Sequence, residues 1–302
     1  MSNPINTGSH PKALWPGVNA WFGAKYDQFS PEYTKIFDVQ GSTQHFEEDV
    51  EHAGFGLAPV KPEGVSAAFQ GHSQGYISRY THVAYALGYI VTKEEQADNL
   101  YEKVSRQRAS SLAYSMSQTR ENVGANILNR AFTAGYTGGD GKVLGATDHT
   151  MQNGDSFANI ITAADLSEAS LEELCILIGN MTDSMGLKAS IRPKCLIINI
   201  AEQFNAQRIL KSVLQSDTAN NAINALNSMN SIPETAVNHY LTNADAFFIT
   251  TNAPEGLKWF DRAPVEFTHD GDFDTENDKS KAYMRFSAGW TDPRGIVCSE
   301  GA

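Results

Sequence analysis

The sequence predicts an α+β fold that is long in one direction, and three features of the chain carry this prediction. A helical pattern with no proline runs from about residue 93 to 132. A strand-rich segment at 41–92, with a Pro- and Gly-rich centre, precedes it. Helix and strand patterns alternate over 145–245, and strands dominate over 246–302. At 1.5 Å per residue the helix would be about 60 Å long, so the fold must extend beyond one compact core.

Composition and charge narrow the classes of function. The 302 residues carry a net charge of −12, and no block of lysine or arginine could follow a phosphate backbone, so direct duplex binding is not expected. The N-terminus lacks a secretory signal pattern, and the apolar runs are too short to span a bilayer. None of the three cysteines has metal-ligand spacing, so we expect buried free thiols in a reducing compartment.

Residues 1–40 are expected to form an extended arm, because four prolines interrupt this stretch. The arm is rich in aromatic residues, including Trp15, Trp21 and Phe22. A free disordered tail would not carry so many large rings, so the arm should lie against a surface. That surface could belong to another subunit or to the chain's own core, and the residues favour neither interpretation.

The segment 41–92 predicts a long β-hairpin. Its centre, GFGLAPVKPEGVSA, concentrates turn residues, and the flanking stretches QHFEEDVEHAGF and THVAYALGYIV are rich in strand formers. Lys61 and Glu63 lie at the predicted tip, and Arg79 lies on the returning side. A two-stranded ribbon is marginally stable alone, so we expect it to lean on a neighbour.

The segment 93–132 predicts one long helix. Thr92 can cap its start, and Glu94 and Glu95 suit the first turn. Apolar residues recur every three or four positions, the period of one helical face. These are Leu100, Val104, Leu112, Met116, Val123, Ile127 and Ala131. Arg108 and Ser115 interrupt any coiled-coil heptad, so the helix should lie across a sheet.

The later part of the chain predicts an α/β region followed by strands. Ser170 and Glu173 form a possible capping box for a helix that Gly186 would end. RPKCLIINI predicts a buried strand, followed by a helix over 202–215 and a loop over 216–238. Three further strands are predicted in NADAFFITTN, KWFDRAPVEFTHD and KAYMRFSAGWTDPRGIVC.

Two motifs that could bind phosphate or a metal are incomplete. Around GGDGKV, Tyr136 takes the place of the first phosphate-loop glycine, and Val143 takes that of the Ser or Thr. The stretch from Asp270 is similar to a calcium loop, but Thr275 and Lys281 replace its glycine and glutamate. We therefore expect no cofactor and no metal site.

Asp148 and His149 are the one pair that could belong to a hydrolase. The chain has no GxSxG motif, and an Asp-His pair in a glycine-rich loop is more often structural. We therefore expect no catalytic residues and no enzyme activity. A soluble α/β enzyme that uses this pair stays as an alternative.

The order of these parts resembles the major capsid proteins of tailed bacteriophages with the Hong Kong 97-type fold, and within them the major head subunits of Mu-like phages. The family's extended loop and spine helix are matched by KPEGVSAAFQGHSQGYISRYTHVAYALGYIVTKEEQADNLY and by TRENVGANILNRAF with DGKVLGATDH. Its axial domain is matched by ADLSEASLEELCILIGNMTDSMGLKASIRPKCLIINIAEQFNAQRIL. Its returning strands are matched by HYLTNADAFFITTNAPEGLKWFDRAPVEF and RFSAGWTDPRGIV.

The resemblance implies a division of the chain and a biological role. The parts are an N-terminal arm (1–40), an extended hairpin loop (41–92), a peripheral domain with the spine helix (93–144), an axial domain (145–245), and strands that return to the peripheral domain (246–302). The implied role is a structural subunit that self-assembles as hexamers and pentamers into an icosahedral head around double-stranded DNA. Assembly would occur in the host cytoplasm, with no membrane.

The resemblance also implies partners and contact residues. A portal, a scaffolding protein and a decoration protein are expected, and the scaffold should be a separate protein because the arm begins at the first residues. Contacts between subunits are expected at Trp15, Trp21, Phe22, Lys61, Glu63 and Arg79. Some members cross-link a lysine to an asparagine, but Glu63 favours the charged amine of Lys61, so we expect an electrostatic contact there.

An encapsulin-type compartment shell, which shares this fold, is the second alternative. Such a shell would need a groove for a cargo peptide formed by an N-terminal helix. The Pro- and Gly-rich residues 1–40 do not predict such a helix.

Overall fold

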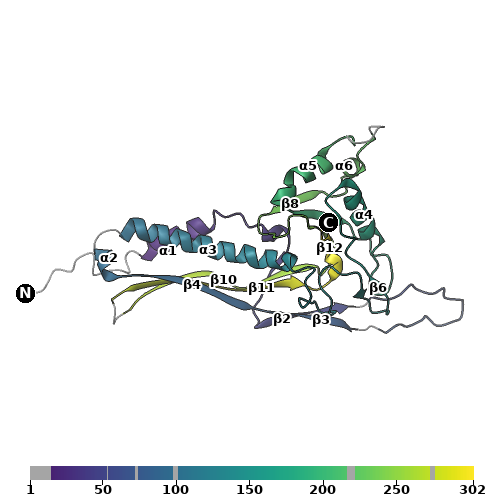
Figure 1. The fold of residues 1–302 in the computed structure, drawn as a ribbon. Coiled ribbons are helices and arrows are strands. Elements are labelled where there is room, and N and C mark those ends of the chain that lie inside the picture. The colour runs from purple at the N-terminus through teal and green to yellow at the C-terminus, as the bar shows by residue number, and fades with distance from the viewer. Residues whose placement is uncertain (1–14, 53, 72–73, 98–100, 216–221, 273–275) are drawn as a thin grey trace, which may run out of the picture.

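The computed structural model describes the chain apart from residues 1–14, 53, 72–73, 98–100, 216–221 and 273–275. It has a long, thin part and a smaller α/β lobe at one end of it (Figure 1). A two-stranded ribbon lies below that end, and the loop that joins its strands projects beyond the body. Within the described residues, no helix is both long and apolar enough to cross a membrane.

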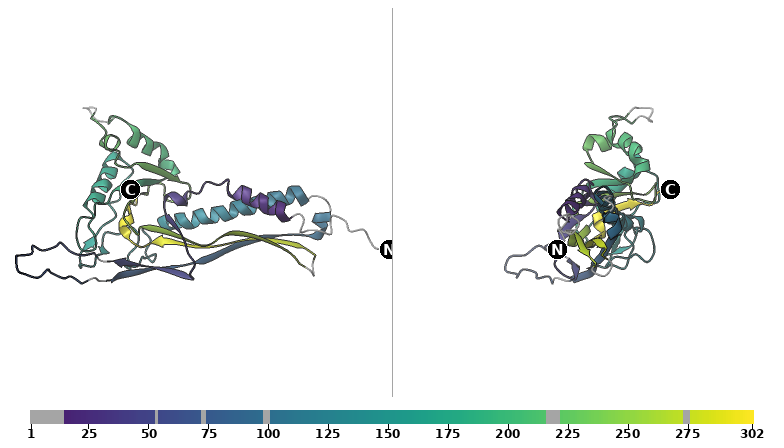
Figure 2. Two further views of the ribbon diagram at one scale, coloured as in Figure 1. Left: turned by 180° about the vertical axis from the view of Figure 1, so that it is seen from behind. Right: turned by 90° about the vertical axis from the view of Figure 1, so that its left-hand side faces the viewer.

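The long part is a four-stranded sheet covered by helices on one face. Its order is β1 (Asp38–Gly41), β10 (Leu257–Gly271), β11 (Asp278–Trp290) and β4 (Val83–Val91). β1 is parallel to β10, and the other pairs are antiparallel. The helix α3 (Tyr101–Asn129) lies along the sheet, and α1 (Trp15–Tyr26) packs beside α3 (Figure 2).

An aromatic core joins α3 to this sheet. Trp259 of β10 is fully buried, and its ring stacks on Tyr33 at 4.3 Å and on Phe286 at 4.5 Å between centroids. Gly124, the one glycine of α3, faces this core, where an added Cβ would lie 3.3 Å from Tyr33 and 3.5 Å from Trp259. Glycine therefore lets the helix backbone approach the rings, at some cost in helix propensity.

The α/β lobe is a second four-stranded sheet with helices packed on it. Its order is β12 (Ile296–Ser299), β9 (Phe247–Thr251), β7 (Pro193–Asn199) and β8 (Glu234–Asn238). Around it lie α4 (Glu168–Asn180), α5 (Gln203–Lys211) and α6 (Ala225–Met229). Leu196 and Ile198 of β7 face the lobe's own core, whereas Cys195 and Ile197 join the core beneath α3. Because both faces are buried, β7 is a continuous apolar run.

The predicted single helix over 93–132 is wrong in its length. The structure has α2 (Lys93–Ala97) and α3, and the residues between them, 98–100, are not described. Glu95 of α2 binds Arg108 of α3 through hydrogen bonds of 2.8 and 3.0 Å. Thirteen residues of straight helix would separate the two by about 20 Å. α2 must therefore turn back against α3. The predicted cap is confirmed, since Thr92 Oγ1 accepts from the Glu95 N–H at 3.4 Å.

The predicted hairpin pairs differently from the expectation. β2 (Phe46–His52) pairs with β3 (Gln74–Thr81), while the stretch expected to return, THVAYALGYIV, forms β4 of the long sheet. The chain passes from ribbon to sheet at His82, which is buried between the hydroxyls of Ser42 and Ser287, each at 2.9 Å. These two contacts fix the point at which β3 ends and β4 begins.

The extended arm predicted for residues 1–40 is wrong from residue 15 onward. The structure has the helix α1 and the short 3-10 helix η3 (Tyr33–Lys35) there, whereas residues 1–14 lie outside the described part. Pro16 sits in the first turn of α1, where a helix needs no N–H donor from it. Phe22, Tyr33 and Phe37 are buried in the chain's own core.

Several later elements also differ from the predictions. α4 is capped by Ser167, whose side chain accepts from the Ser170 N–H at 3.2 Å, and the helix ends at Asn180 rather than Gly186. The predicted loop over 216–238 contains α6 and β8. Of the last four strands, only β10 and β11 belong to the long sheet, and β9 and β12 belong to the lobe. A minor hairpin joins β5 (His149–Thr150) to β6 (Ser156–Phe157).

Candidate functional site

The loop between β2 and β3 is the feature that leaves the body of the molecule, and we call its described residues, 54–71, the projecting loop (Figure 1). Its tip is a type II turn: the Val65 N–H donates to Pro62 O at 3.3 Å, and Gly64 has φ +79°. Nearer the base, the Gly56 N–H donates to Gln70 Oε1 at 2.8 Å. These bonds hold the two sides of the loop together.

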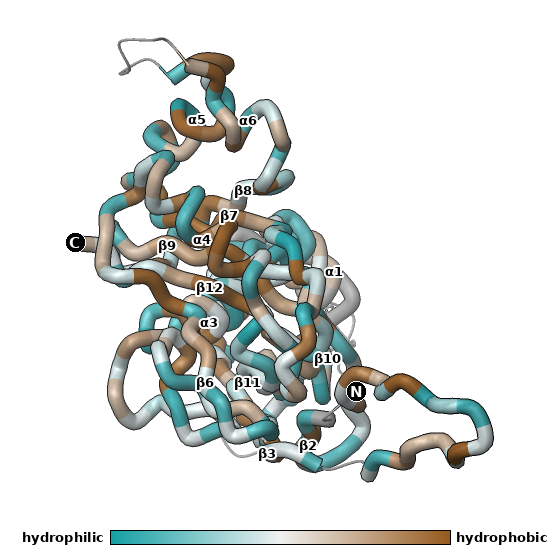
Figure 3. The backbone as a smooth tube through the Cα atoms, turned by 90° about the vertical axis from the view of Figure 1, so that its right-hand side faces the viewer, coloured by the Kyte–Doolittle hydropathy of each residue, from teal (hydrophilic) through white to brown (hydrophobic). Residues whose placement is uncertain are grey.

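Large apolar side chains on this loop are exposed. Leu57 is 83%, Val60 93% and Phe69 95% exposed, and Val65 is 52% exposed. Figure 3 shows hydrophobic stretches on both sides of the loop. Several large apolar side chains exposed on one projecting loop are typical of a contact with another molecule, because their exposure to water is unfavourable.

The six residues predicted to contact other subunits do not form one cluster. Lys61 and Glu63 are exposed at the loop tip, and within the described loop no ion pair joins them. Arg79 is engaged within the ribbon, at 2.7 Å from Glu48. Phe22 is buried and stacks on Phe267 of its own chain at 4.8 Å between centroids. Trp15 and Trp21 lie in α1, and their side chains fall outside the described part.

The base of the ribbon is fixed to the long sheet by a buried lysine. The Lys258 side chain is 6% exposed, and its ammonium lies 2.7 Å from Asp49 Oδ2 of β2 and also pairs with Glu255. Thr291 donates to the same Asp49 oxygen at 3.0 Å. Burial favours the neutral amine, but the two carboxylates outweigh it and raise the pKa of Lys258.

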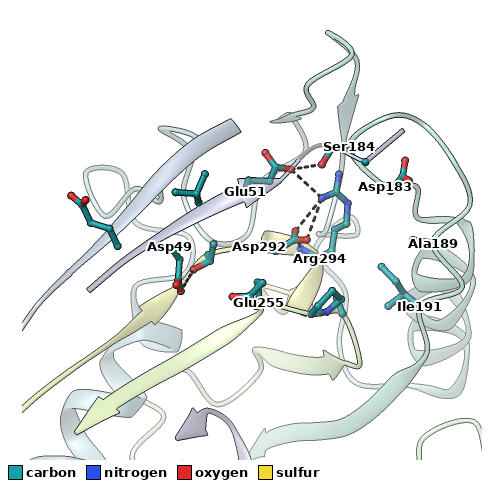
Figure 4. Close-up of a pocket in the computed structure, with 15 residues that line it drawn as sticks. Asp49, Glu51, Asp183, Ser184, Ala189, Ile191, Glu255, Asp292 and Arg294 are labelled. Carbon is teal, nitrogen blue, oxygen red and sulfur yellow. Dashed lines mark hydrogen bonds and ion pairs between the residues drawn. The ribbon is translucent and has the colours of Figure 1, made fainter. Parts of the chain in front are cut away.

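A buried arginine fixes the ribbon to the lobe (Figure 4). The Arg294 side chain is 4% exposed, contacts Asp292 at 3.2 and 3.3 Å, and lies 3.6 Å from Glu51 of β2. Its Nε donates to Thr182 O at 2.7 Å, and Ser184 donates to Glu51. Burial raises the pKa of Asp292, and the Arg294 charge opposes that rise. This second cluster has no sequence signature, because its members are scattered along the chain.

The two chain crossings between lobe and long sheet touch at this base. The Asp292 N–H donates to Glu255 O at 2.7 Å, and the Thr291 N–H donates to Gly256 O at 3.2 Å. A Cβ on Gly295 would lie 2.4 Å from the Gly256 Cα, so glycine is required for this approach. The ribbon, the long sheet and the lobe are therefore locked together at one junction.

The Asp148–His149 pair does not form a catalytic arrangement. His149 is fully buried, with Nδ1 at 2.6 Å from Asp140 Oδ2 and Nε2 at 3.2 Å from Asn159 Oδ1. Asp148 pairs instead with Lys142. These contacts support a structural role for His149 in the 134–148 segment. In the part of the chain that the structure describes, no group of His, Cys, Asp or Glu is arranged to hold a metal ion.

A sheet covered by a long helix, an α/β lobe at one end and a projecting loop are the parts that the resemblance predicted for a shell-forming capsid fold. The sequence profile of the family described as "Phage capsid protein" matches residues 76–299, and the chain belongs to that family. It is a capsid shell protein with the Hong Kong 97-type fold that the sequence predicted. Its expected place among Mu-like head subunits, and the domain boundaries, stay predictions. No curated protein matches the chain.

Solved capsid structures are similar in fold and distant in sequence. The capsid of a native GTA particle has a TM-score of 0.55 at 9% identity, covering 90% of each chain. The Mycobacterium phage Patience structure has a TM-score of 0.53 at 11% identity, covering 100% of this chain and 90% of that one. A virus-like particle from Pyrococcus furiosus has a TM-score of 0.52 at 12% identity, covering 93% of this chain and 97% of that one.

Proposed function

We propose that the chain is the major head subunit of a tailed phage and assembles, through hexamers and pentamers, into an icosahedral shell that encloses double-stranded DNA. The observation that carries this proposal is the projecting loop, an apolar surface held at a rigid junction and extended away from its own body. A loop that served only its own chain would fold its apolar side chains back onto the chain's core.

A second apolar surface supports contacts around a ring of subunits. Exposed large apolar residues gather on the α/β lobe, around α4, α5 and α6. They are Ile176, Ile200, Phe204, Val213, Ile223 and Met229. Figure 3 shows this hydrophobic region near α5 and α6, at the end of the lobe away from the long sheet. Two separate apolar surfaces suit a subunit that contacts several neighbours at once.

The net charge and the expected partners of the chain also fit a shell subunit. The net charge of −12 disfavours tight binding of the shell wall to packaged DNA, which suits a container rather than a DNA-binding protein. The subunit is structural and non-enzymatic, and it assembles in the host cytoplasm. It works with a portal, a scaffolding protein and a decoration protein, without a membrane.

The helix α1 bears on the encapsulin-type alternative. We expected residues 1–40 to lack a helix, and α1 shows that this expectation is wrong. α1 packs on α3 and buries Phe22 in the chain's own core. The described face of α1 that meets α3 is therefore already covered and leaves no groove for a cargo peptide there. The match to the phage capsid family favours a phage head over a compartment with a cargo enzyme.

Electron microscopy and gel filtration of the expressed chain test this proposal. We expect capsomers or shells from the wild type, and hydrogen exchange should show residues 54–71 protected in shells but not in isolated subunits. The variant Leu57→Ser/Phe69→Ser should stay a folded, unassembled subunit by circular dichroism. A wild type that remains a small oligomer under all assembly conditions, or equal protection of the loop in both states, would overturn the proposal.

A further inference from the structure

We infer that His82 is a pH-sensitive hinge residue, which holds the ribbon against the long sheet while its ring is neutral and releases the ribbon when its ring is protonated. The ribbon carries the projecting loop, so the hinge controls the direction of that loop (Figure 1). The hinge is a property of the single chain and goes beyond the proposed function, so subunits that never assemble can test it.

Both connections between the long sheet and the ribbon meet at His82. One connection is the segment 42–45, which joins β1 to β2, and the other is His82 itself, the single residue between β3 and β4. The His82 side chain is buried, with Nε2 at 2.9 Å from Ser42 Oγ of the first connection and Nδ1 at 2.9 Å from Ser287 Oγ of β11. This one ring therefore ties both connections to the sheet.

The hydrogen bonds around the ring suit its neutral form. The Ser42 hydroxyl donates its proton to Glu47 Oε1 at 2.5 Å, so its oxygen accepts from the ring and the Nε2 atom carries the ring proton. Nδ1 then has a lone pair, which accepts from the Ser287 hydroxyl. A second ring proton would make Nδ1 a donor, and the Ser287 hydroxyl would have to turn its own proton away. Protonation therefore disturbs the contact between the hinge and β11.

The surroundings of the ring also oppose its protonation. Burial disfavours the charged form, and so do the positive groups of Arg285 in β11, Arg262 in β10 and His45 in the first connection. The carboxylate of Glu47 in β2 acts in the opposite direction. Burial and these cations together lower the pKa of His82 from its ordinary value. The charges on β2, β10 and β11 therefore agree with the hydrogen bonds.

The lowered pKa gives the hinge a defined pH range. When the ribbon detaches from the sheet, the ring meets water and should titrate near its ordinary pKa of about 6.5. The attached ribbon keeps the ring neutral to lower pH, so detachment takes up a proton below about pH 6.5. The hinge is therefore closed at neutral pH and weakens as the pH falls. At about pH 5.5 the opening equilibrium can grow by up to about tenfold, because the detached ring is then about ten parts protonated to one part neutral.

Hydrogen exchange on unassembled subunits tests the hinge. Between about pH 7.5 and about pH 5.5, the protection factors of amides in β2 and β3 should fall by up to about tenfold in the wild type, and those in β7 of the lobe should not follow. His82→Gln places an uncharged, hydrogen-bonding side chain at the hinge, so β2 and β3 should lose this pH dependence. His239→Gln is the matched control, because His239 binds Glu32 and not the hinge, and it should keep the wild-type dependence.

Arg285→Gln distinguishes a titrating ring from a ring that only fills space, and it decides the matter if His82→Gln does not fold. It removes a charge that opposes protonation, so the pKa of His82 should rise towards its ordinary value and the acid loss of protection should become smaller. Nitrogen NMR should show the Nε2–H form of the ring at neutral pH and a titration below the ordinary value. A ring that titrates at its ordinary value, or a wild-type ribbon equally protected at both pH values, would overturn the hinge. A folded His82→Gln chain that keeps the pH dependence would overturn it as well.

Discussion

The core beneath α3 and the projecting loop are built from the same kinds of residue and have opposite surroundings. Trp259 and Phe286 are 0% and 1% exposed, whereas Val60 and Phe69 are 93% and 95% exposed. The core stabilises one chain, while the loop has apolar surface left for another chain. The difference shows that hydrophobic content alone does not tell which contacts are internal. The junction holds the base of the ribbon so that the loop points away from the body, and the loop's apolar side chains therefore stay outside the chain's own core.

Trp259→Ala should have the largest effect on the isolated chain. The indole fills the space between α3 and the long sheet and contacts Tyr33, Phe37 and Phe286. Its loss should lower the free energy of unfolding by about 3–5 kcal/mol, measured by urea denaturation of unassembled subunits. Trp259→Phe, which keeps a ring, should cost less. A loss below about 1 kcal/mol would mean that this core does not hold the long part together.

Arg294→Met should have the next largest effect, because it acts at the junction between core and loop. Removing the guanidinium leaves Glu51 and Asp292 without their buried counter-charge, which should cost about 3 kcal/mol. The ribbon should also loosen, and hydrogen exchange in β2 and β3 should rise. Adding Asp292→Asn to this variant should recover part of the loss. An additive double variant would show that the two side chains are not coupled.

The sequence predicted this fold where one local pattern dominates. The apolar run of β7, the Gly and Pro residues of the loop and the helical period of apolar residues in α3 are each a strong local signal. The errors fall where tertiary contacts outweigh local preference. β4 has a strand pattern that fits either the hairpin or the sheet, and buried His82 decides between them. α1 contains Pro16, whose position in the first turn makes it harmless.

The candidate site was only partly visible in the sequence. Lys61 and Glu63 at the loop tip follow from the turn composition, and their exposure agrees with that placement. The junction could not be found, because Glu51, Lys258 and Arg294 come together only when the two crossings meet. Gly256 and Gly295 face each other where the two crossings touch, but in the sequence each glycine is indistinguishable from an ordinary turn residue. They therefore indicate the junction only weakly.

Glu121→Gln should have a smaller effect that depends on pH. Glu121 of α3 accepts the backbone N–H groups of Glu32 and Tyr33 at 3.0 and 3.1 Å, and burial raises its pKa above the unfolded value. The folded chain then binds a proton more tightly than the unfolded chain, so this group's contribution to stability falls as pH rises through that window. Urea denaturation between about pH 4 and 7 should show a shallower fall in Glu121→Gln than in the wild type. Parallel pH profiles would contradict this role.

Phe69→Ser should have the smallest effect on the isolated chain, although its chemical change is large. Phe69 is 95% exposed, so its loss should change the free energy of unfolding by less than about 0.5 kcal/mol. The matched variant Phe248→Ser removes a ring that is 1% exposed and packs against Phe132, and should cost about 3–5 kcal/mol. In assembly the order should reverse: folded Phe69→Ser subunits should give few shells in electron micrographs. If both variants destabilised the unassembled chain equally, the loop would be part of the chain's own core.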